Sequence, residues 1–192
     1  VRSYLGLFRA QGLRLFVEAG GVWRLLDEPS AFEMWPDGCR WLYRHAGGVI
    51  EVRSEARSDP HALGLDIDVA DGAPTRCLVC LHVAFDGDDG SAPGRVNAWR
   101  DGRAVVFAPA PASELANRFP NGHWRIEPSS GDTTIERLGG DELLFADGVT
   151  RELPYLVLTT AAARTACFTI LGRFIDHGPD VPAPDRPDLV TG

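Results

Sequence analysis

Aromatic side chains close to polar groups are the residues of this sequence that best fit a binding chemistry. Five tryptophans are present, and two of them lie in the short stretch from Glu33 to His45. A flat indole offers an apolar face to the C–H groups of a sugar, and nearby Arg, Asp or His side chains can bind its hydroxyls. We therefore expect carbohydrate contacts from Trp35, Trp41, Arg44, His45, Trp99 and Trp124. Core packing is the commoner role for any single tryptophan, and Trp35 is expected to be the most exposed because it abuts the 36–38 turn.

Acid–base and nucleophilic chemistry find less support. The five histidines are far apart and form neither an H-x-H nor an H-E-x-x-H spacing. His82 stands alone in an apolar run, which favours a satisfied core residue over a ligand. No serine has a G-x-S-x-G setting, and no glycine-rich loop precedes a helix. A glycosidase needs two carboxylates about 5–9.5 Å apart, which a sequence cannot pair, so we assign no catalytic residue.

Metal or redox chemistry has two candidate sites. Cys77 and Cys80 form a C-x-x-C spacing, which is used by zinc and redox sites. Both fall in an apolar run predicted as a strand, where positions three apart face opposite sides, so we expect free core thiols. The acidic run 86–94 lacks the glutamate that would complete an EF-hand loop, and a solvated loop is favoured over calcium. We expect neither metal nor cofactor.

Short strands would have to position these residues. From Leu63 to Val69 every odd residue is apolar and every even residue is small or acidic, which is the period of a half-buried strand. Val49 to Ala56 alternates in the same way. Cys77 to Phe85 is apolar on both faces apart from His82, which predicts an interior strand. Turn chemistry at 59–60 and 71–72 separates the three blocks.

The same pattern of short strands separated by turns continues along the chain. Strands are expected at 13–17, 22–26, 31–34, 39–45, 123–127, 133–138, 142–145, 155–160 and 165–174, with another before Gly12. A hairpin is expected over 96–107, with Asp101-Gly102 as a type I′ turn, and one helical turn over 113–118. About a dozen strands exceed what one open sheet usually holds. The prediction is an all-β fold, a two-sheet antiparallel β-sandwich with at most one or two short helices.

Composition limits the class of protein. The 192 residues carry a net charge of −8, which disfavours nucleic-acid partners, and no run reaches the roughly 20 apolar residues of a membrane helix. The first residue is Val1 and the single methionine is Met34, so we expect a segment of a longer protein. Prolines cluster between 179 and 187, which predicts a sandwich domain at 1–176 and a linker or tail at 177–192.

The order of blocks resembles a known family. A Gly-Gly turn leads into 49–54, Asp59-Pro60-His61 opens the alternating strand, and 77–83, 140–148 and 154–158 follow. This resembles the N-terminal β-sandwich of cellobiose-phosphorylase-like proteins, the group of glycoside hydrolase family 94, with a galactose-mutarotase-like supersandwich fold. The resemblance implies an accessory domain that supports or lines a carbohydrate site completed by an adjacent (α/α)6 barrel, which carries the catalytic acid. It carries over no catalytic residue and, with the free cysteines, favours a cytoplasmic location.

Two other functions stay open. One is a self-sufficient carbohydrate-binding module, which requires an exposed platform of coplanar aromatic rings. The other is a mutarotase-like sugar epimerase, in which His82 or His123 would face a cleft beside a carboxylate.

Overall fold

Strand-forming sequence dominates the described part of the chain. A computed structural model describes residues 12–58, 60–83, 96–111 and 113–174, and in these ranges it contains two antiparallel sheets. The five-stranded sheet has the order β11-β12-β7-β1-β2, and its strands are β1 (Leu13–Ala19), β2 (Val22–Leu25), β7 (Cys77–His82), β11 (Ile135–Gly139) and β12 (Tyr155–Thr160). The eight-stranded sheet has the order β3-β4-β5-β6-β13-β10-β9-β8, and its strands are β3 (Ala31–Trp35), β4 (Gly38–His45), β5 (Gly48–Ser58), β6 (His61–Gly72), β8 (Val96–Asp101), β9 (Ala104–Pro109), β10 (His123–Pro128) and β13 (Thr165–Arg173). The predicted all-β two-sheet fold is confirmed.

Alternation along β6 sets the two faces of the large sheet. Leu65, Ile67 and Val69 are buried, whereas Asp66 and Asp68 are exposed, as the period of two predicts. We call the face that packs against the five-stranded sheet the inner face and the opposite one the outer face. Cross-strand partners share a face, so the register assigns every residue of the sheet to one side.

The five-stranded sheet is apolar on both sides, and β7 lies at its centre. Cys77 belongs to the main core between the sheets, whereas Cys80 belongs to a second apolar cluster on the other side. The prediction that the two thiols face opposite sides is therefore confirmed. The short 3₁₀ helix η1 (Asp141–Leu144) supplies the buried Leu143 to the second cluster.

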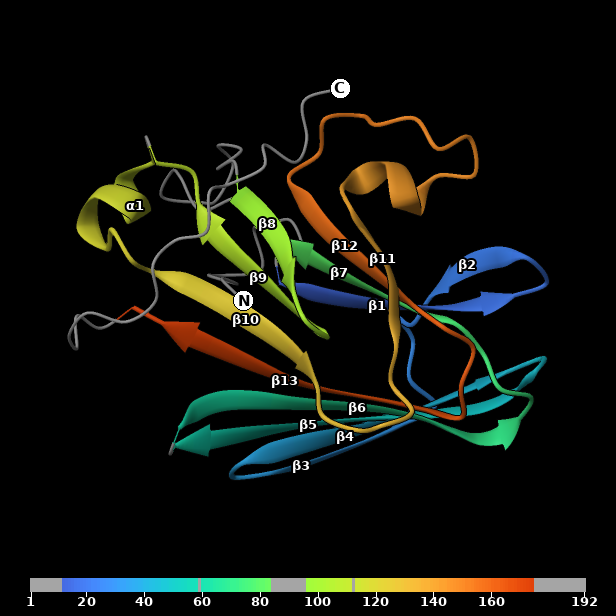
Figure 1. The fold of residues 1–192 in the computed structure, drawn as a ribbon. Coiled ribbons are helices and arrows are strands. Elements are labelled where there is room, and N and C mark those ends of the chain that lie inside the picture. The colour runs from blue at the N-terminus through green and yellow to red at the C-terminus, as the bar shows by residue number, and fades with distance from the viewer. Residues whose placement is uncertain (1–11, 59, 84–95, 112, 175–192) are drawn as a thin grey trace, which may run out of the picture.

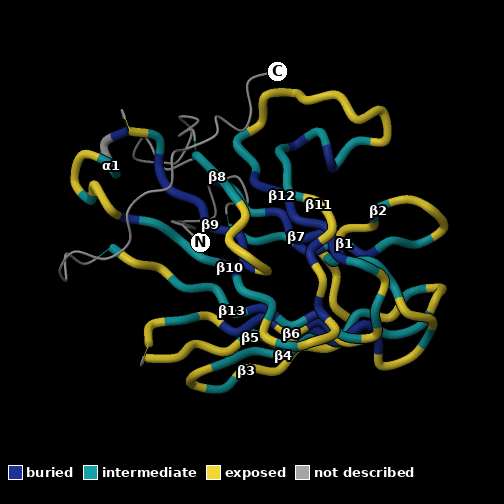
Figure 2. Tube along the Cα trace, in the orientation of Figure 1, coloured by how far each residue is buried: buried dark blue, intermediate teal, exposed yellow. Residues whose placement is uncertain are grey.

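One continuous core fills the space between the sheets. Its largest fully buried side chains include Phe168, Ile50 and Ile67 from the large sheet and Leu158 from the small one. Figure 2 shows the buried segments where the sheets face each other and the exposed ones along β3 and the loops. The large sheet runs from β3 to β8 around the small sheet (Figure 1).

Arg100 connects an edge strand of the large sheet to an edge strand of the small sheet. The Arg100 guanidinium on β8 donates to the carbonyl oxygens of Ile135 (3.1 Å) and Glu136 (3.0 Å) on β11. These bonds fasten an edge strand of one sheet to an edge strand of the other. The helix α1 (Glu114–Arg118) follows β9, and its first turn is capped by the Ser113 side chain, which accepts from the backbone N–H of Ala116.

Two local predictions were wrong. Residues 142–145 form no strand, because Asp141–Leu144 is helical and the Glu142 carboxylate accepts the backbone N–H of Gly140. The β8–β9 loop is Gly102-Arg103, one residue later than expected, because Asp101 pairs with Ala104. Gly102 has φ +60° and Arg103 has no positive φ, which fits a type II′ turn instead of type I′. The strand expected before Gly12, the 86–94 loop and the proline-rich tail lie outside the described residues.

Candidate functional site

The register distributes the six predicted sugar-contacting residues over both faces of the large sheet. Trp41 opposes Val52, which opposes the buried Ile67, so the Trp41 indole points to the inner face. It packs partly buried against the main core, and its ring centroid lies 5.6 Å from that of the exposed Phe32. Trp41 therefore closes the end of the core beside the edge strand β3.

Trp124 also belongs to the inner face, on β10. Its ring stacks on Phe107 with centroids 5.1 Å apart and lies 4.3 Å from Phe174. Phe174 in turn meets Phe119 edge to face at 5.5 Å. With neighbours on two sides, Trp124 serves mainly as packing, and little of its ring surface is left for a ligand.

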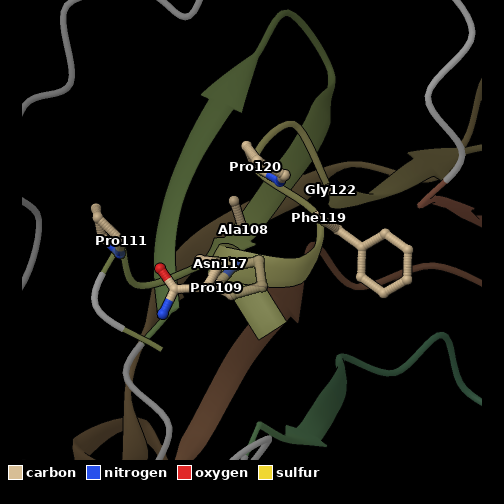
Figure 3. Close-up of a pocket in the computed structure, with 8 residues that line it drawn as sticks. Ala108, Pro109, Pro111, Asn117, Phe119, Pro120 and Gly122 are labelled. Atoms are coloured by element: carbon tan, nitrogen blue, oxygen red, sulfur yellow. The ribbon is translucent and has the colours of Figure 1, made fainter. Parts of the chain in front are cut away.

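A shallow pocket opens beside this aromatic cluster. Its volume is about 330 Å³, and it is lined by Ala108, Pro109, Pro111, Ala116, Asn117, Phe119, Pro120 and Gly122. The Asn117 amide is the one side-chain hydrogen-bonding group in this lining. Figure 3 shows the Phe119 ring directed away from the prolines of the lining. A sugar would find few hydrogen-bond partners there.

Trp35, Arg44 and His45 lie towards the β3 edge but do not converge. The Trp35 indole covers Gly38, since a Cβ on that glycine would come within 2.7 Å of its Nε1. Arg44 is exposed on the outer face, and its backbone N–H donates to the Ser30 hydroxyl at 3.2 Å. His45 closes the β4–β5 turn, where its Nδ1 accepts the Gly47 N–H at 3.1 Å.

An ion-pair network lies between the β3 edge and the centre of the large sheet, and it was not predicted from the sequence. Arg40 donates to Glu33 at 3.1 Å and to Glu51 at 2.7 Å, and Arg53 also pairs with Glu51. Although Glu51 is buried, the bond from Arg40 and the charge of Arg53 hold its pKa below the usual range. The available signal was the Glu51-x-Arg53 spacing, since residues two apart on a strand share a face.

Trp99 lies at the opposite edge of the same sheet, on the outer face of β8. It opposes Val106, and Val106 opposes Arg125 on β10. Arg125 forms ion pairs with both Asp101 and Glu127. An indole and three charged groups therefore share one patch, and the Arg125-x-Glu127 spacing was again the signal in the sequence.

The histidines proposed for epimerase chemistry have other partners. The ring of His82 meets Tyr155 edge-on at 5.5 Å, and burial together with the charge of Arg14 lowers the pKa of His82. The His123 Nδ1 lies 3.0 Å from the Asn121 carbonyl oxygen. Among the described residues no three His, Cys, Asp or Glu side chains are placed to hold a metal ion, and no helix is long and apolar enough to cross a membrane.

Comparison with known proteins decides the family. A model of the glycoside phosphorylase supersandwich domain matches residues 1–172. The chain belongs to this family. A 1,2-beta-oligoglucan phosphorylase of Listeria innocua serovar 6a is 23% identical over 136 residues. That match covers 71% of this chain and 12% of the relative, so the chain spans about an eighth of the relative's length.

The supersandwich fold also appears in a solved polysaccharide lyase. The superposition has a TM-score of 0.51 at 14% sequence identity, and it covers 86% of this chain and 26% of the lyase. Identity this low shows a shared fold alone. Within this supersandwich domain, Trp41 and Trp124 pack on the main core and Trp23 on the second cluster, whereas Trp35 and Trp99 belong to neither.

Proposed function

We propose that this chain is a non-catalytic supersandwich domain of a larger glycoside phosphorylase, and that it supports or lines a sugar site completed by a separate helical-barrel domain. The observation that carries the proposal is the family match over residues 1–172, joined to a much longer relative of which the match covers only 12%. The two buried acids of the described ranges add support, because both have structural roles: Glu51 pairs with arginines of the large sheet, and Asp141 holds the loop after η1.

The proposed reaction of the larger protein is phosphorolysis of 1,2-β-linked oligoglucans, by analogy with the oligoglucan phosphorylase. In phosphorolysis, an orthophosphate oxygen bonds to the anomeric carbon as the glycosidic C–O bond breaks. A general acid protonates the departing oxygen, and the products are a sugar 1-phosphate and a shortened chain. We assign the acid to the barrel domain and leave this chain the task of positioning the glucan.

Sugar contacts by this chain remain part of the proposal. Trp35, Arg44 and Trp99 are the candidates on the outer face of the large sheet, whereas Trp41 and Trp124 point to the inner face and His45 closes a turn. The outer-face group has the better access, because the five-stranded sheet occupies the inner side.

The test is an assay of the full gene product beside the 192-residue chain alone. Each is incubated with 1,2-β-oligoglucans and orthophosphate, and release of glucose 1-phosphate is measured. We expect the full product to be active and the chain alone to be inactive. Activity in the chain alone, or a full product that shows no phosphate-dependent cleavage of any oligoglucan, would contradict the proposal.

A carbohydrate-binding module is the second candidate. Trp99 favours it, because this tryptophan lies outside both apolar clusters and a binding site needs a ring that packing has not used. Screening the chain against a set of immobilised glycans separates the two functions. Binding in the micromolar range to a polysaccharide that the full product does not degrade would favour the module.

A further inference from the structure

The outer face at the β8 edge carries an aromatic and charged patch with a fixed geometry. Trp99, Val106 and Arg125 are successive cross-strand partners, so they lie in one row on one face. Val105 and Phe107, which alternate with Val106, point into the main core, so this row is on the outer side. Neighbouring strands are about 4.8 Å apart, which places the backbones of Trp99 and Arg125 about 10 Å apart.

Arg125 holds two carboxylates in place on this face. Its Nε donates to Glu127 and its Nη1 to Asp101. The Arg125 side chain is 29% exposed, against 61% for Asp101 and 42% for Glu127. Arg125 is therefore the least exposed of the three charged side chains, and the two carboxylates are accessible to a ligand. A carboxylate has about four acceptor positions, and within the described ranges each acid accepts a side-chain hydrogen bond from Arg125 alone.

Trp99 is not used by packing elsewhere. It belongs to neither apolar cluster, and in the described part of the chain no hydrogen bond or ring contact involves it. Trp99 is partly exposed, and its cross-strand partner Val106 is buried. The patch therefore combines an aromatic side chain with carboxylate oxygens that Arg125 already orients. Acceptors that are oriented before binding reduce the entropy lost when a ligand binds.

We propose that Trp99, Asp101, Arg125 and Glu127, here named the β8–β10 patch, form a binding site for neutral oligosaccharides. A pyranose would lie on Trp99, and its hydroxyls would donate to Asp101 and Glu127. The inference rests on the proposed function and adds the location of the contact and the charge class of the ligand. One cation and two anions leave the patch at −1, so uronate polymers and phosphorylated sugars are repelled.

A purely structural role is the competing explanation. In that case Trp99 covers Val106, the ion pairs brace the β8–β9 hairpin, and no ligand is involved. Both explanations allow some loss of stability on mutation. Only the binding site predicts a loss of affinity for one charge class of glycan.

The test is calorimetric titration of the 192-residue chain with 1,2-β-oligoglucans and, separately, with oligogalacturonates. We expect heat of binding with the neutral glucan only, and a Trp99→Ala variant that binds at least about tenfold more weakly, as truncation of a central aromatic contact does. The control is Phe32→Ala, which removes an exposed ring at the opposite edge of the same sheet and should bind as the wild type does.

Two milder variants keep the test decisive if Trp99→Ala does not fold. Trp99→Phe retains a smaller ring, and Asp101→Asn retains the shape of the acid. Each variant should bind the glucan severalfold more weakly, while its melting temperature stays within a few degrees of the wild-type value. Unchanged affinity in the folded Trp99 and Asp101 variants, equal loss in Phe32→Ala, or equal binding of oligogalacturonate would overturn the proposal. Absence of any glucan binding would do so too, while the phosphorolysis assay judges the proposed function independently.

Discussion

At the scale of single residues, Asp141 is a buried acid that accepts three hydrogen bonds from one loop. The residue is 2% exposed, and its carboxylate accepts hydrogen bonds from the Thr150 hydroxyl at 2.5 Å, the Arg151 N–H at 2.7 Å and the Leu153 N–H at 3.3 Å. One acid therefore fixes the loop that leads from η1 to β12. An alanine there leaves two backbone donors without their acceptor, which is more costly than the loss of an exposed pair.

We predict that Asp141→Ala lowers the free energy of unfolding by about 2–4 kcal/mol, measured by urea denaturation. Asp141→Asn should lose less than half as much, since the amide oxygen can still accept both backbone N–H groups. Asp147→Ala, which removes an exposed acid of the same loop, is the control and should have a much smaller effect. Equal losses for Asp141→Ala and Asp147→Ala would disprove this role.

The buried thiols predict a dependence of stability on alkaline pH. Burial raises the pKa of Cys77 to about 12, against an ordinary value of 9.0, and that of Cys80 also to about 12. The unfolded chain releases these protons at lower pH than the folded chain. Stability is therefore fully present below pH 9 and falls as the pH rises from 9.0 towards 12.

This chain suits the measurement because all its basic side chains other than histidine are arginine, so no lysine titrates in that range. We expect Cys77→Ala/Cys80→Ala to show a shallower fall in unfolding free energy between pH 8.5 and 10.5 than the wild type, measured by urea denaturation at each pH. Val79→Ala makes a cavity in the same strand without removing a thiol and should keep the wild-type slope. Parallel slopes for all three proteins would contradict the assignment.

At the scale of elements, the β4–β5 turn requires glycine. Gly48 has φ +136° and opposes Gly72, which has φ +116°, across the start of β5. A Cβ on Gly48 would come within 2.0 Å of the Asp71 carbonyl oxygen, which is backbone and cannot move aside. Two strands of the large sheet therefore approach each other at a point that no side chain fits.

We predict that Gly48→Ala costs at least about 2 kcal/mol of unfolding free energy, since the strained backbone and the clash add. Gly102→Ala is the matched control. Gly102 also has a positive φ, +60°, but a Cβ there meets nothing within 4 Å, so its cost should be about 1 kcal/mol. A Gly48→Ala protein as stable as Gly102→Ala would show that the close approach relaxes.

The strands were predictable where alternation or apolar runs were strong, because these patterns report burial directly. The 142–145 segment misled for a physical reason: Leu143 and Leu144 look like strand residues, yet the Glu142 carboxylate accepts the Gly140 N–H and the segment forms a 3₁₀ turn. Alternation did not predict the buried Glu51, because its burial depends on Arg40 and Arg53, which lie across strands. The grouping of Trp99 with Arg125 likewise depends on a register between β8, β9 and β10 that no local signal gives.

At the scale of the whole molecule, one core joins both sheets, and this predicts a single cooperative unfolding transition. Phe168 on β13 is 1% exposed and lies in the cluster that also contains Val79 and Leu158 of the five-stranded sheet. Neither sheet can lose its inner face to water without exposing the other.

We predict that tryptophan fluorescence and reactivity of the buried thiols report the same urea midpoint in a Cys39→Ser/Cys167→Ser background. Four of the five tryptophans lie in the eight-stranded sheet, whereas Cys77 and Cys80 lie in the other, so each probe reports mainly one sheet. Phe168→Ala should lower the unfolding free energy by about 3–5 kcal/mol and move both midpoints together. Phe32→Ala, which removes a 51% exposed ring, should change it by no more than about 0.5 kcal/mol. If Phe168→Ala separated the two midpoints, the sheets would be independent units, and the β8–β10 patch could not rely on the small sheet for support through Arg100.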